Sequence, residues 1–446
     1  GFSAQMMYFK GLMDKLGVTA QIFYAGKFKS ATEPFRRKNM TPENREQVSK
    51  YMSGMYDLYL EDLAASRDIS AAELFRIANN ALIRNSEDAV SYKMVDATKY
   101  KDEIIDELRD KLGTDEDDEM EMVSLSKYYS VQKSELNKSS DNEKIAVVYA
   151  EGSIVDGKGE SGSIGGDKYA AIIRKIRKDD KVKAIVMRVN SGGGSALASD
   201  IIWRELEKAK EQGIKIVTSM GDVAASGGYY IASNSEEIFA ENNTITGSIG
   251  VFGMIPNTRG LYEEHLGLTM DTVKIGKFSL MSGMGMFYEF NEEESAIIQS
   301  GVDEVYTTFK KRVSDGRGKS MEEVDEIAQG RVWLGNTALE IGLVDKIGGL
   351  EDAIGSVASL ANLEEDNYQL VHYPKTKSFE EKIMALLGDN TGDKNAKTKV
   401  LEDISGGLMH AQTSTVPDFY QVMQQLKTIK QMKGIQMRLP YAIEIH

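Results

Sequence analysis

Ser226 is the residue best placed for nucleophilic chemistry, because two alanines precede it and two glycines follow it in residues 221–230 (GDVAASGGYY). An apolar run of strand length comes before this segment and a short helix is expected from Tyr229, so we expect the serine at a strand-to-helix turn. Small neighbours let a carbonyl group approach, and free N–H groups at a helix start can stabilise an oxyanion. A plain Ser-Gly-Gly turn that caps a helix is the alternative.

A second glycine-rich loop follows the preceding strand pattern, at residues 190–195 (NSGGGS). Consecutive glycines let the backbone approach a ligand with its N–H groups exposed. No P-loop signature with its lysine is present, which argues against phosphate binding. Since the two loops follow neighbouring strands, one can supply an oxyanion donor and the other the nucleophile; a flexible connector is the alternative.

A nucleophilic serine needs a base, and the four histidines do not fit that role. His265 is expected on a helix beyond the sheet, and the others lie in the C-terminal tail, at His372, His410 and His446. The remaining candidate is a lysine with a lowered pKa, as in Ser–Lys variants of the catalytic triad. An internal repeat singles out Lys29, for which a solvent-exposed lysine beside Glu33 is the alternative interpretation.

The repeat pairs residues 26–29 (GKFK) with 276–279 (GKFS), and the offset of 250 residues persists with one gap over some ninety positions. Such a register favours duplication over a chance likeness of two helical stretches. The second copy has Ser279 where the first has Lys29, so we expect one active site assembled from both copies. Residues 145–249 of the second copy have no partner, and the chain opens without a start methionine or signal peptide. We therefore expect the front of the first copy, with any membrane anchor, to be missing.

The elements that position these loops alternate between strands and helices. Strands are expected at residues 145–150, 184–189, 215–220 and 237–240, and helices at 167–178 and 196–211. This alternation predicts an α/β domain with a largely parallel sheet, whose functional loops lie beyond the carboxyl ends of the strands. The predicted domains are the end of a first repeat (1–112), an acidic and polar linker (113–144), a complete second repeat (145–360) and a C-terminal extension (361–446). Within that extension we expect a helix at 417–433 and a strand at 439–445.

Composition excludes several classes of function. The 446 residues carry a net charge of −15, which leaves no basic footprint for nucleic acid. The absence of cysteine removes disulfides, thiolate nucleophiles and cysteine metal sites. The histidines lack metal-ligand spacing, so we expect neither a metal nor another cofactor. No apolar run approaches the ~18 residues of a membrane span.

Four segments, in order along the chain, resemble motifs of the signal peptide peptidase A family, also called protease IV, in its long tandem-repeat form. They are residues 26–35 (GKFKSATEPF), 190–195 (NSGGGS), 221–230 (GDVAASGGYY) and 246–251 (TGSIGV). The likeness covers roughly residues 1–360. Gly192 stands where the family usually has proline, which loosens that loop.

The resemblance implies a fold and a set of site residues. The fold would be α/β, with tandem ClpP/crotonase-like superhelix domains of which the first is truncated. Ser226 would be the nucleophile and Lys29, rather than Lys27, the general base. The N–H groups of Gly227 and Gly194 would form the oxyanion hole, and the Ser248 hydroxyl would help to hold the lysine amine.

The resemblance also implies a serine endopeptidase that hydrolyses cleaved signal peptides and other extended apolar peptides through an acyl-enzyme. It implies a homotetramer on the outer face of the bacterial plasma membrane, or in thylakoids, held there by the missing N-terminal segment. Lys29 must be neutral to accept the serine proton, so the site must lower its pKa by roughly 3 units, mainly by desolvation. An alkaline pH optimum follows.

Two other interpretations stay open. A crotonase-type enzyme acting on acyl-CoA would use the same loops to hold a thioester, together with a carboxylate acid or base. A non-catalytic assembly module would be compatible with the repeat and the acidic linker. The methionine-rich residues 278–288 (FSLMSGMGMFY) are interpreted either as the lining of a substrate groove or as an ordinary loop.

Overall fold

The computed structural model describes residues 1–115, 120, 122–124, 128, 143–281, 286–364, 367–375 and 435–438. The chain forms two compact units. The smaller comprises Gly1–Ala4, Ser49–Asn142 and Glu444–His446, and the larger comprises Gln5–Val48 and Glu143–Ile443. Lys29 and Ser226 both belong to the larger unit. The helix expected at 417–433 and the strand expected at 439–445 lie outside the described residues, and the predicted domain boundaries stay a prediction.

The larger unit is built on an eight-stranded sheet whose main path runs β11-β9-β7-β5-β2-β13, with β8 paired to β7 and β12 paired to β8. Its shorter strands are β8 (Glu237–Ala240), β9 (Ile245–Gly247), β11 (Val332–Leu334), β12 (Lys346–Ile347) and β13 (Tyr368–Tyr373). Its long central strands are β2 (Glu143–Glu151), β5 (Val182–Ser191) and β7 (Lys215–Ala225), which run parallel. Residues on both faces of these strands are buried, and they divide between two hydrophobic clusters. Strands buried on both faces consist of nearly continuous apolar runs, which is why the sequence located them.

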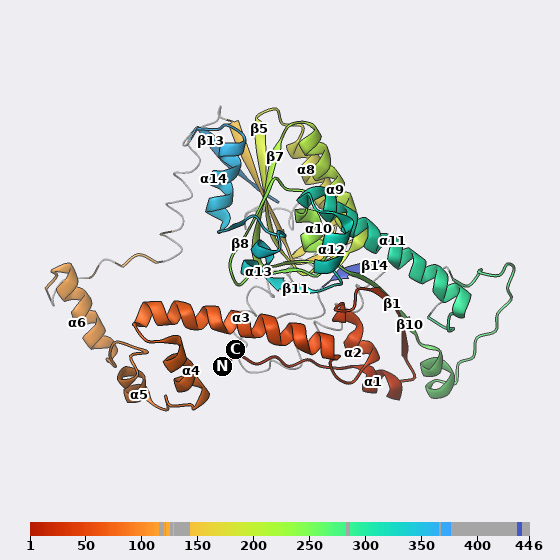
Figure 1. The fold of residues 1–446 in the computed structure, drawn as a ribbon, viewed down its shortest axis with the longest axis horizontal. Helices are drawn as coiled ribbons and strands as arrows, with labels where there is room; N and C mark the ends of the chain where they lie inside the picture. The colour runs from red at the N-terminus through yellow and green to blue at the C-terminus, as the bar shows by residue number, and fades with distance from the viewer. Residues whose placement is uncertain are drawn as a thin grey trace, which may run out of the picture. The chain divides into compact units, whose positions relative to one another are not determined.

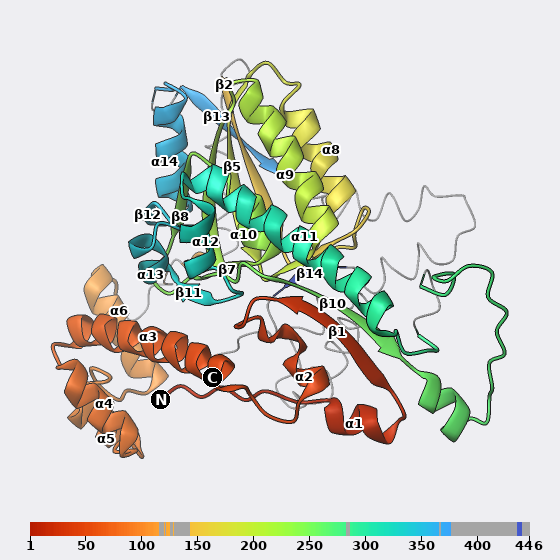
Figure 2. The ribbon, with the colours of Figure 1, turned by 45° about the vertical axis from the view of Figure 1, so that its right-hand side comes forward.

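Helices cover both faces of this sheet (Figures 1 and 2). One face carries α14 (Leu350–Leu360), and the other carries α8 (Gly166–Ile176), α9 (Ala196–Glu211) and α10 (Gly227–Ala232). Each of α8, α9 and α10 follows a strand of the unit in sequence, as expected for strand–helix–strand crossovers. The α/β class predicted from the sequence is therefore confirmed.

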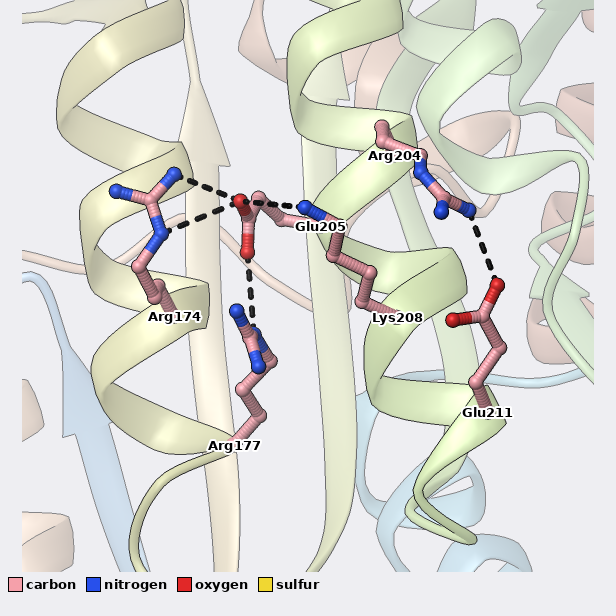
Figure 3. A network of polar contacts seen from close by, with 6 residues as sticks. All are labelled: Arg174, Arg177, Arg204, Glu205, Lys208 and Glu211. Carbon is pink, nitrogen blue, oxygen red and sulfur yellow. Dashed lines mark hydrogen bonds and ion pairs between the residues drawn. The ribbon is translucent and has the colours of Figure 1, made fainter.

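Helices α8 and α9 are joined by one buried carboxylate, that of Glu205 (Figure 3). Arg174 donates two hydrogen bonds to its Oε1, at 2.7 and 3.2 Å, and Arg177 donates one to its Oε2 at 3.1 Å. Burial raises the pKa of Glu205, but the hydrogen bonds from the two arginines outweigh burial and leave the pKa below its ordinary value. A charged Glu205 thus fixes the spacing of the two helices that cover the sheet.

A second, six-stranded sheet runs β1-β10-β14-β6-β3-β4. Its strands are β1 (Thr19–Ala25), β10 (Val251–Asn257), β14 (Ile435–Arg438), β6 (Gly193–Ser195), β3 (Ser153–Val155) and β4 (Ser163–Gly165). Strand β1 pairs antiparallel with β10 along its whole length, from Thr19↔Asn257 to Ala25↔Val251. Strand β14, from near the end of the chain, lies between β10 and β6 and is antiparallel to both. This sheet brings together segments from three distant parts of the sequence.

Two sets of four helices, far apart in the chain, have matching spacing along the sequence. The first set is α3 (Pro42–Arg67), α4 (Ala71–Asn79), α5 (Ser86–Ser91) and α6 (Lys101–Leu112), and the second is α11 (Glu292–Arg317), α12 (Met321–Ile327), α13 (Gly335–Glu340) and α14. Ser70 and Ser320 cap α4 and α12 in the same way, each accepting a hydrogen bond from the backbone N–H three residues later. None of the helices within the described residues is both long and apolar enough to span a membrane.

Candidate active site

Ser226 occupies the turn between β7 and α10, and its side chain is fully buried. Its φ of 57° and ψ of −118° are strained for a residue with a side chain, at a cost of roughly 1–3 kcal/mol. The turn is held by hydrogen bonds from Ser226 N to Gly247 O and from Tyr230 N to Ser226 O, both 2.8 Å long. A nucleophile on such a sharp strand-to-helix turn presents its hydroxyl clear of its own backbone.

The amine of Lys29 meets the hydroxyl of Ser226 in the buried interior of the larger unit. Lys29 Nζ lies 2.8 Å from Ser226 Oγ, 3.1 Å from Ser248 Oγ and 3.2 Å from Ser248 O. Only 1% of the lysine is exposed. Burial lowers the pKa of Lys29 to about 7, because the charged ammonium loses its hydration there. The amine is therefore substantially neutral near neutral pH and can accept a proton.

Ser248 contacts the lysine amine from the end of a short strand of the eight-stranded sheet. It follows β9 (Ile245–Gly247), has a φ of 51° and is buried. Its backbone N–H donates to Arg331 O at 2.7 Å, and its hydroxyl lies 3.4 Å from Gly330 O. If its two N–H bonds go to the hydroxyl and the carbonyl of Ser248, a neutral amine can accept the hydroxyl proton of Ser226 through its lone pair.

The backbone on either side of Lys29 is docked against the loop at residues 329–330. Phe28 N donates to Gln329 O at 2.8 Å, and Lys29 N closes a turn onto Gly26 O at 3.0 Å. A Cβ atom on Gly330 would lie 2.8 Å from Lys29 Cβ, closer than real Cβ atoms approach. Glycine at 330 is therefore required for the lysine segment to approach this closely.

The two glycine-rich loops lie against each other beside Ser226. The position that a Cβ atom on Gly193 would take is 2.6 Å from Gly227 N and 2.0 Å from Met437 O. The N–H of Gly193 is already bonded to Ser191 Oγ at 3.1 Å. Gly194 lies in β6, with Ile154 and Met437 as its strand partners. Of these glycines, Gly227 and Gly194 carry the N–H groups that the resemblance assigns to an oxyanion hole.

The other residues considered as bases lie elsewhere. Lys27 is exposed, with its amine 5.1 Å from the centre of the Phe28 ring. His265 ends an exposed helical turn, and His372 lies 3.2 Å from the Tyr149 hydroxyl. The remaining histidines, His410 and His446, lie outside the described residues, as do residues 282–285 of the methionine-rich segment.

Sequence reasoning missed a group of buried polar side chains behind Lys29. Glu33 is only 2% exposed and accepts hydrogen bonds from Thr41 Oγ1 at 2.5 Å and Asn44 Nδ2 at 2.8 Å. Gln47, also 2% exposed, bonds to the backbone next to the lysine. The signal that could have found them is the spacing of Asn44 and Gln47, three residues apart on one face of a helix.

The chain resembles known peptidases over most of its length. Residues 1–115 and 208–364 match the sequence model of peptidase family S49. Protease 4 of Salmonella typhi is 38% identical over 381 residues, which cover 83% of this chain and 60% of that protein. Protease 4 of Haemophilus influenzae is 35% identical over 373 residues, with 82% and 60% covered. The chloroplastic serine protease SPPA of Arabidopsis thaliana is 32% identical over 367 residues, with 81% and 54% covered.

This chain thus spans about 60% or less of the length of these relatives. The matched residues include both the segment that carries Lys29 and the turn that carries Ser226. A buried amine with a lowered pKa can take the proton of a neighbouring serine hydroxyl, which makes the serine oxygen a stronger nucleophile. Such an activation needs no histidine.

Proposed function

Because the chain belongs to peptidase family S49, we propose that it is a serine endopeptidase whose nucleophile is Ser226 and whose general base is Lys29. The single observation that carries the proposal is the 2.8 Å contact between a fully buried lysine amine and a fully buried serine hydroxyl. A lysine is seldom buried without a carboxylate partner, since desolvating its charge is costly. A neutral amine with a catalytic task accounts for its position.

The reaction would proceed through an acyl-enzyme. Lys29 Nζ takes the proton of Ser226 Oγ as the oxygen attacks the peptide carbonyl, and the ammonium then returns the proton to the leaving amine. The same amine then takes a proton from water as the water oxygen attacks the ester, and the ammonium returns this proton to Ser226 Oγ as the acyl product leaves as a carboxylic acid. The carbonyl oxygen of each tetrahedral intermediate would be held by N–H groups of Gly227 and Gly194. Ser248 would keep the amine aimed at the serine throughout.

We propose that the substrate binds as an extended strand between β10 and β6. Supporting this, β14 fits between these two strands with antiparallel pairing on both edges, at Phe252↔Gln436 and Gly194↔Met437. Main-chain pairing of this kind accepts many sequences, while side-chain pockets select among them. Met437 is fully buried in that position, which favours apolar side chains. Cleaved signal peptides and other apolar peptides have this character.

The remaining expectations are part of the same proposal. The fold would be of the ClpP/crotonase-like type, and the matching helix spacing of residues 42–112 and 292–360 supports two tandem copies of it. The family resemblance supports a homotetramer on the outer face of the bacterial plasma membrane, or on thylakoid membranes. No nucleic acid and no cofactor would take part.

A fluorophosphonate probe tests the dyad directly. We expect the probe to label Ser226, with a rate that rises as the pH increases through about 7, where Lys29 loses its proton. Lys29→Met should slow labelling by about a thousandfold or more, since it removes the base. Lys27→Met is the matched control, because Lys27 is exposed two residues away, and it should label normally.

Normal labelling of Lys29→Met, or a rate independent of pH between 6 and 9, would remove the dyad from consideration. Turnover of an acyl-CoA thioester instead of a peptide would favour the crotonase-type alternative. No labelling in any variant would favour an assembly module.

A further inference from the structure

We infer that Gln47 is a positioning residue for Lys29, because its amide ties the residues immediately before and after the lysine to β11, the strand paired with the one that precedes Ser248. The inference rests on the proposed function, since it concerns how the proposed base is aimed. Gln47 lies on α3, 2% exposed, and touches neither Ser226 nor the lysine amine in any described contact.

Gln47 contacts the residues immediately before and after the lysine. Its Nε2 donates to Phe28 O at 3.0 Å and lies 3.1 Å from Ser30 Oγ. Its Oε1 accepts from Val332 N at 3.4 Å. One side chain therefore bridges the lysine segment and β11 (Val332–Leu334).

The two backbone partners have opposite polarity, and this fixes which side chain can stand between them. Phe28 O can only accept a hydrogen bond and Val332 N can only donate one. An amide satisfies both at once. An ionised carboxylate offers no donor to Phe28 O. An aliphatic side chain takes this acceptor away from Val332 N and leaves Phe28 O with only the hydrogen bond from Ser30 N, at 2.8 Å.

The bridge reaches Ser248 through β11. Strand β11 pairs antiparallel with β9, with Val332 opposite Gly247, and the neighbouring Arg331 O accepts from Ser248 N at 2.7 Å. Gln47 thus joins the segment that carries the lysine to the strand pair that carries its hydroxyl partner. Moving one relative to the other changes the 3.1 Å contact between Lys29 Nζ and Ser248 Oγ.

A chain of polar groups holds Gln47 in place. Its Nε2 lies 3.1 Å from Asn44 Oδ1, and Asn44 Nδ2 donates to Glu33 Oε2 at 2.8 Å. Three charged side chains lie on the elements around Gln47, and they are Glu33 of α2 (Glu33–Arg36), Glu46 of α3 and Arg331 beside β11. Glu46 and Arg331 pair with each other at 3.2 Å. None of the described hydrogen bonds of the Lys29 amine goes to a charged group.

A positioning role and a purely structural role make different predictions. If Gln47 only stabilises the fold, its loss lowers the melting temperature but leaves each folded molecule with the same chemistry. If it positions Lys29, its loss lets the amine turn away from Ser226 and admits water. The turnover number then falls, and the pH at which activity appears rises toward the ordinary range of lysine.

The experiment compares Gln47→Leu and Gln47→Glu with Thr218→Val in the full chain. Thr218 is a matched control, because it is fully buried in the same unit and its hydroxyl is bonded to Ser235 Oγ at 2.7 Å, away from the lysine. Active sites are first counted with a fluorophosphonate probe. The turnover number, KM for an apolar peptide and the pH–rate profile are then measured per active site.

For Gln47→Leu we expect turnover to fall about tenfold or more with KM nearly unchanged, and the pH midpoint to rise by about one unit. Gln47→Glu should raise the midpoint further, since a new carboxylate behind the lysine favours the ammonium. Gln47→Asn, whose shorter amide cannot reach both backbone partners, should behave like Gln47→Leu and serves if the leucine variant fails to fold. Thr218→Val should leave midpoint and turnover per site unchanged.

Folded Gln47 variants that keep the wild-type pH midpoint and turnover per titrated site, while losing thermal stability as Thr218→Val does, would overturn the inference. Failure of the proposed function looks different, because the wild-type chain itself would then not be labelled by the probe.

Discussion

At the scale of single residues, the site opposes the stability of the fold. Lys29 ordinarily has a pKa of 10.5, and burial lowers it to about 7. The native state therefore binds this proton less well than the unfolded chain does. Above pH 10.5, burial of Lys29 does not lower the free energy of unfolding through this proton. The loss of stability grows as the pH falls from 10.5 toward 7, and it is constant at lower pH. The strained φ of Ser226 adds a second cost.

Replacing the lysine by an apolar side chain of similar length should therefore stabilise the protein. We expect Lys29→Met to raise the free energy of unfolding at pH 7, with about 4 kcal/mol as the upper limit. The gain should shrink as the pH is raised toward 10. Urea denaturation of the wild-type and variant chains at pH 7 and pH 10 measures both effects, and an equal or lower stability of the variant at pH 7 would contradict the argument.

The pairing of Lys29 with Ser226 could be predicted from the sequence, but the side chains that hold the lysine segment in place could not. The repeat exposed a lysine present in only one copy, and small residues marked the serine turn. Gln47 carried no such mark, because a glutamine on a helix is usually solvated. Its role depends on which backbone groups face it from Phe28 and Val332, and these are set by tertiary packing alone.

At the scale of elements, β14 occupies the place between β10 and β6 that the proposed substrate strand would take. If the substrate needs this place, residues 435–438 must leave before a peptide can bind. Ending the chain at residue 434 should therefore raise kcat/KM for an apolar peptide severalfold, and Met437→Asp should act in the same direction because it buries a charge.

Met437→Leu is the control for this prediction and should change little. Hydrolysis of a fluorogenic apolar peptide gives the rates. If the truncated chain is labelled more slowly by the fluorophosphonate probe, β14 is instead a part of the site that the reaction requires.

Element boundaries were predicted well where patterning is strong. The helix at 196–211 and the strand at 237–240 have the predicted bounds, since both have clear patterns and end signals. The strand predicted at 215–220 continues to Ala225, and the short helix begins at Gly227 rather than at 229. Residues 221–228 are mostly glycine and alanine, which give little hydrophobic periodicity, so neither boundary could be predicted from the pattern. In the tail, β14 ends at Arg438, directly before the strand predicted at 439–445.

At the scale of the whole molecule, the two sets of helices contain equivalent ion pairs in different surroundings. Arg67 pairs with Asp96 at 2.9 Å, and Asp96 is 93% exposed. Arg317 pairs with Asp345, and only 6% of that arginine side chain is exposed. Asp345 also accepts a hydrogen bond from Ile238 N at 2.8 Å. The same pair should thus contribute differently to stability in its two settings.

We expect Asp345→Asn to lower the free energy of unfolding by about 2 kcal/mol, because it weakens the hydrogen bonds that the partly exposed carboxylate accepts from the nearly buried Arg317 and from Ile238 N. Asp96→Asn should cost less than about 0.5 kcal/mol, since exposed pairs contribute little. Thermal unfolding of both variants provides the comparison, each serving as the other's control. Equal losses would show that burial does not distinguish the two pairs.

The α/β class followed from strands and helices alternating along residues 145–240, a pattern with a direct physical cause. The second sheet could not be predicted, because β1, β10, β14 and β6 are far apart in the chain and short. Their pairing depends on long-range contacts that leave no local period.

Lys29 and Ser226 are 197 residues apart in the chain, and Lys29 reaches Ser226 from a segment that follows β1, which lies along β10. If the proposed dyad is correct, a chain still leaving the ribosome can carry the lysine, the serine or both and still be unable to cleave peptides, because the two residues have not yet been brought together. The rate at which a covalent probe captures Ser226 during refolding would then report the completion of long-range assembly.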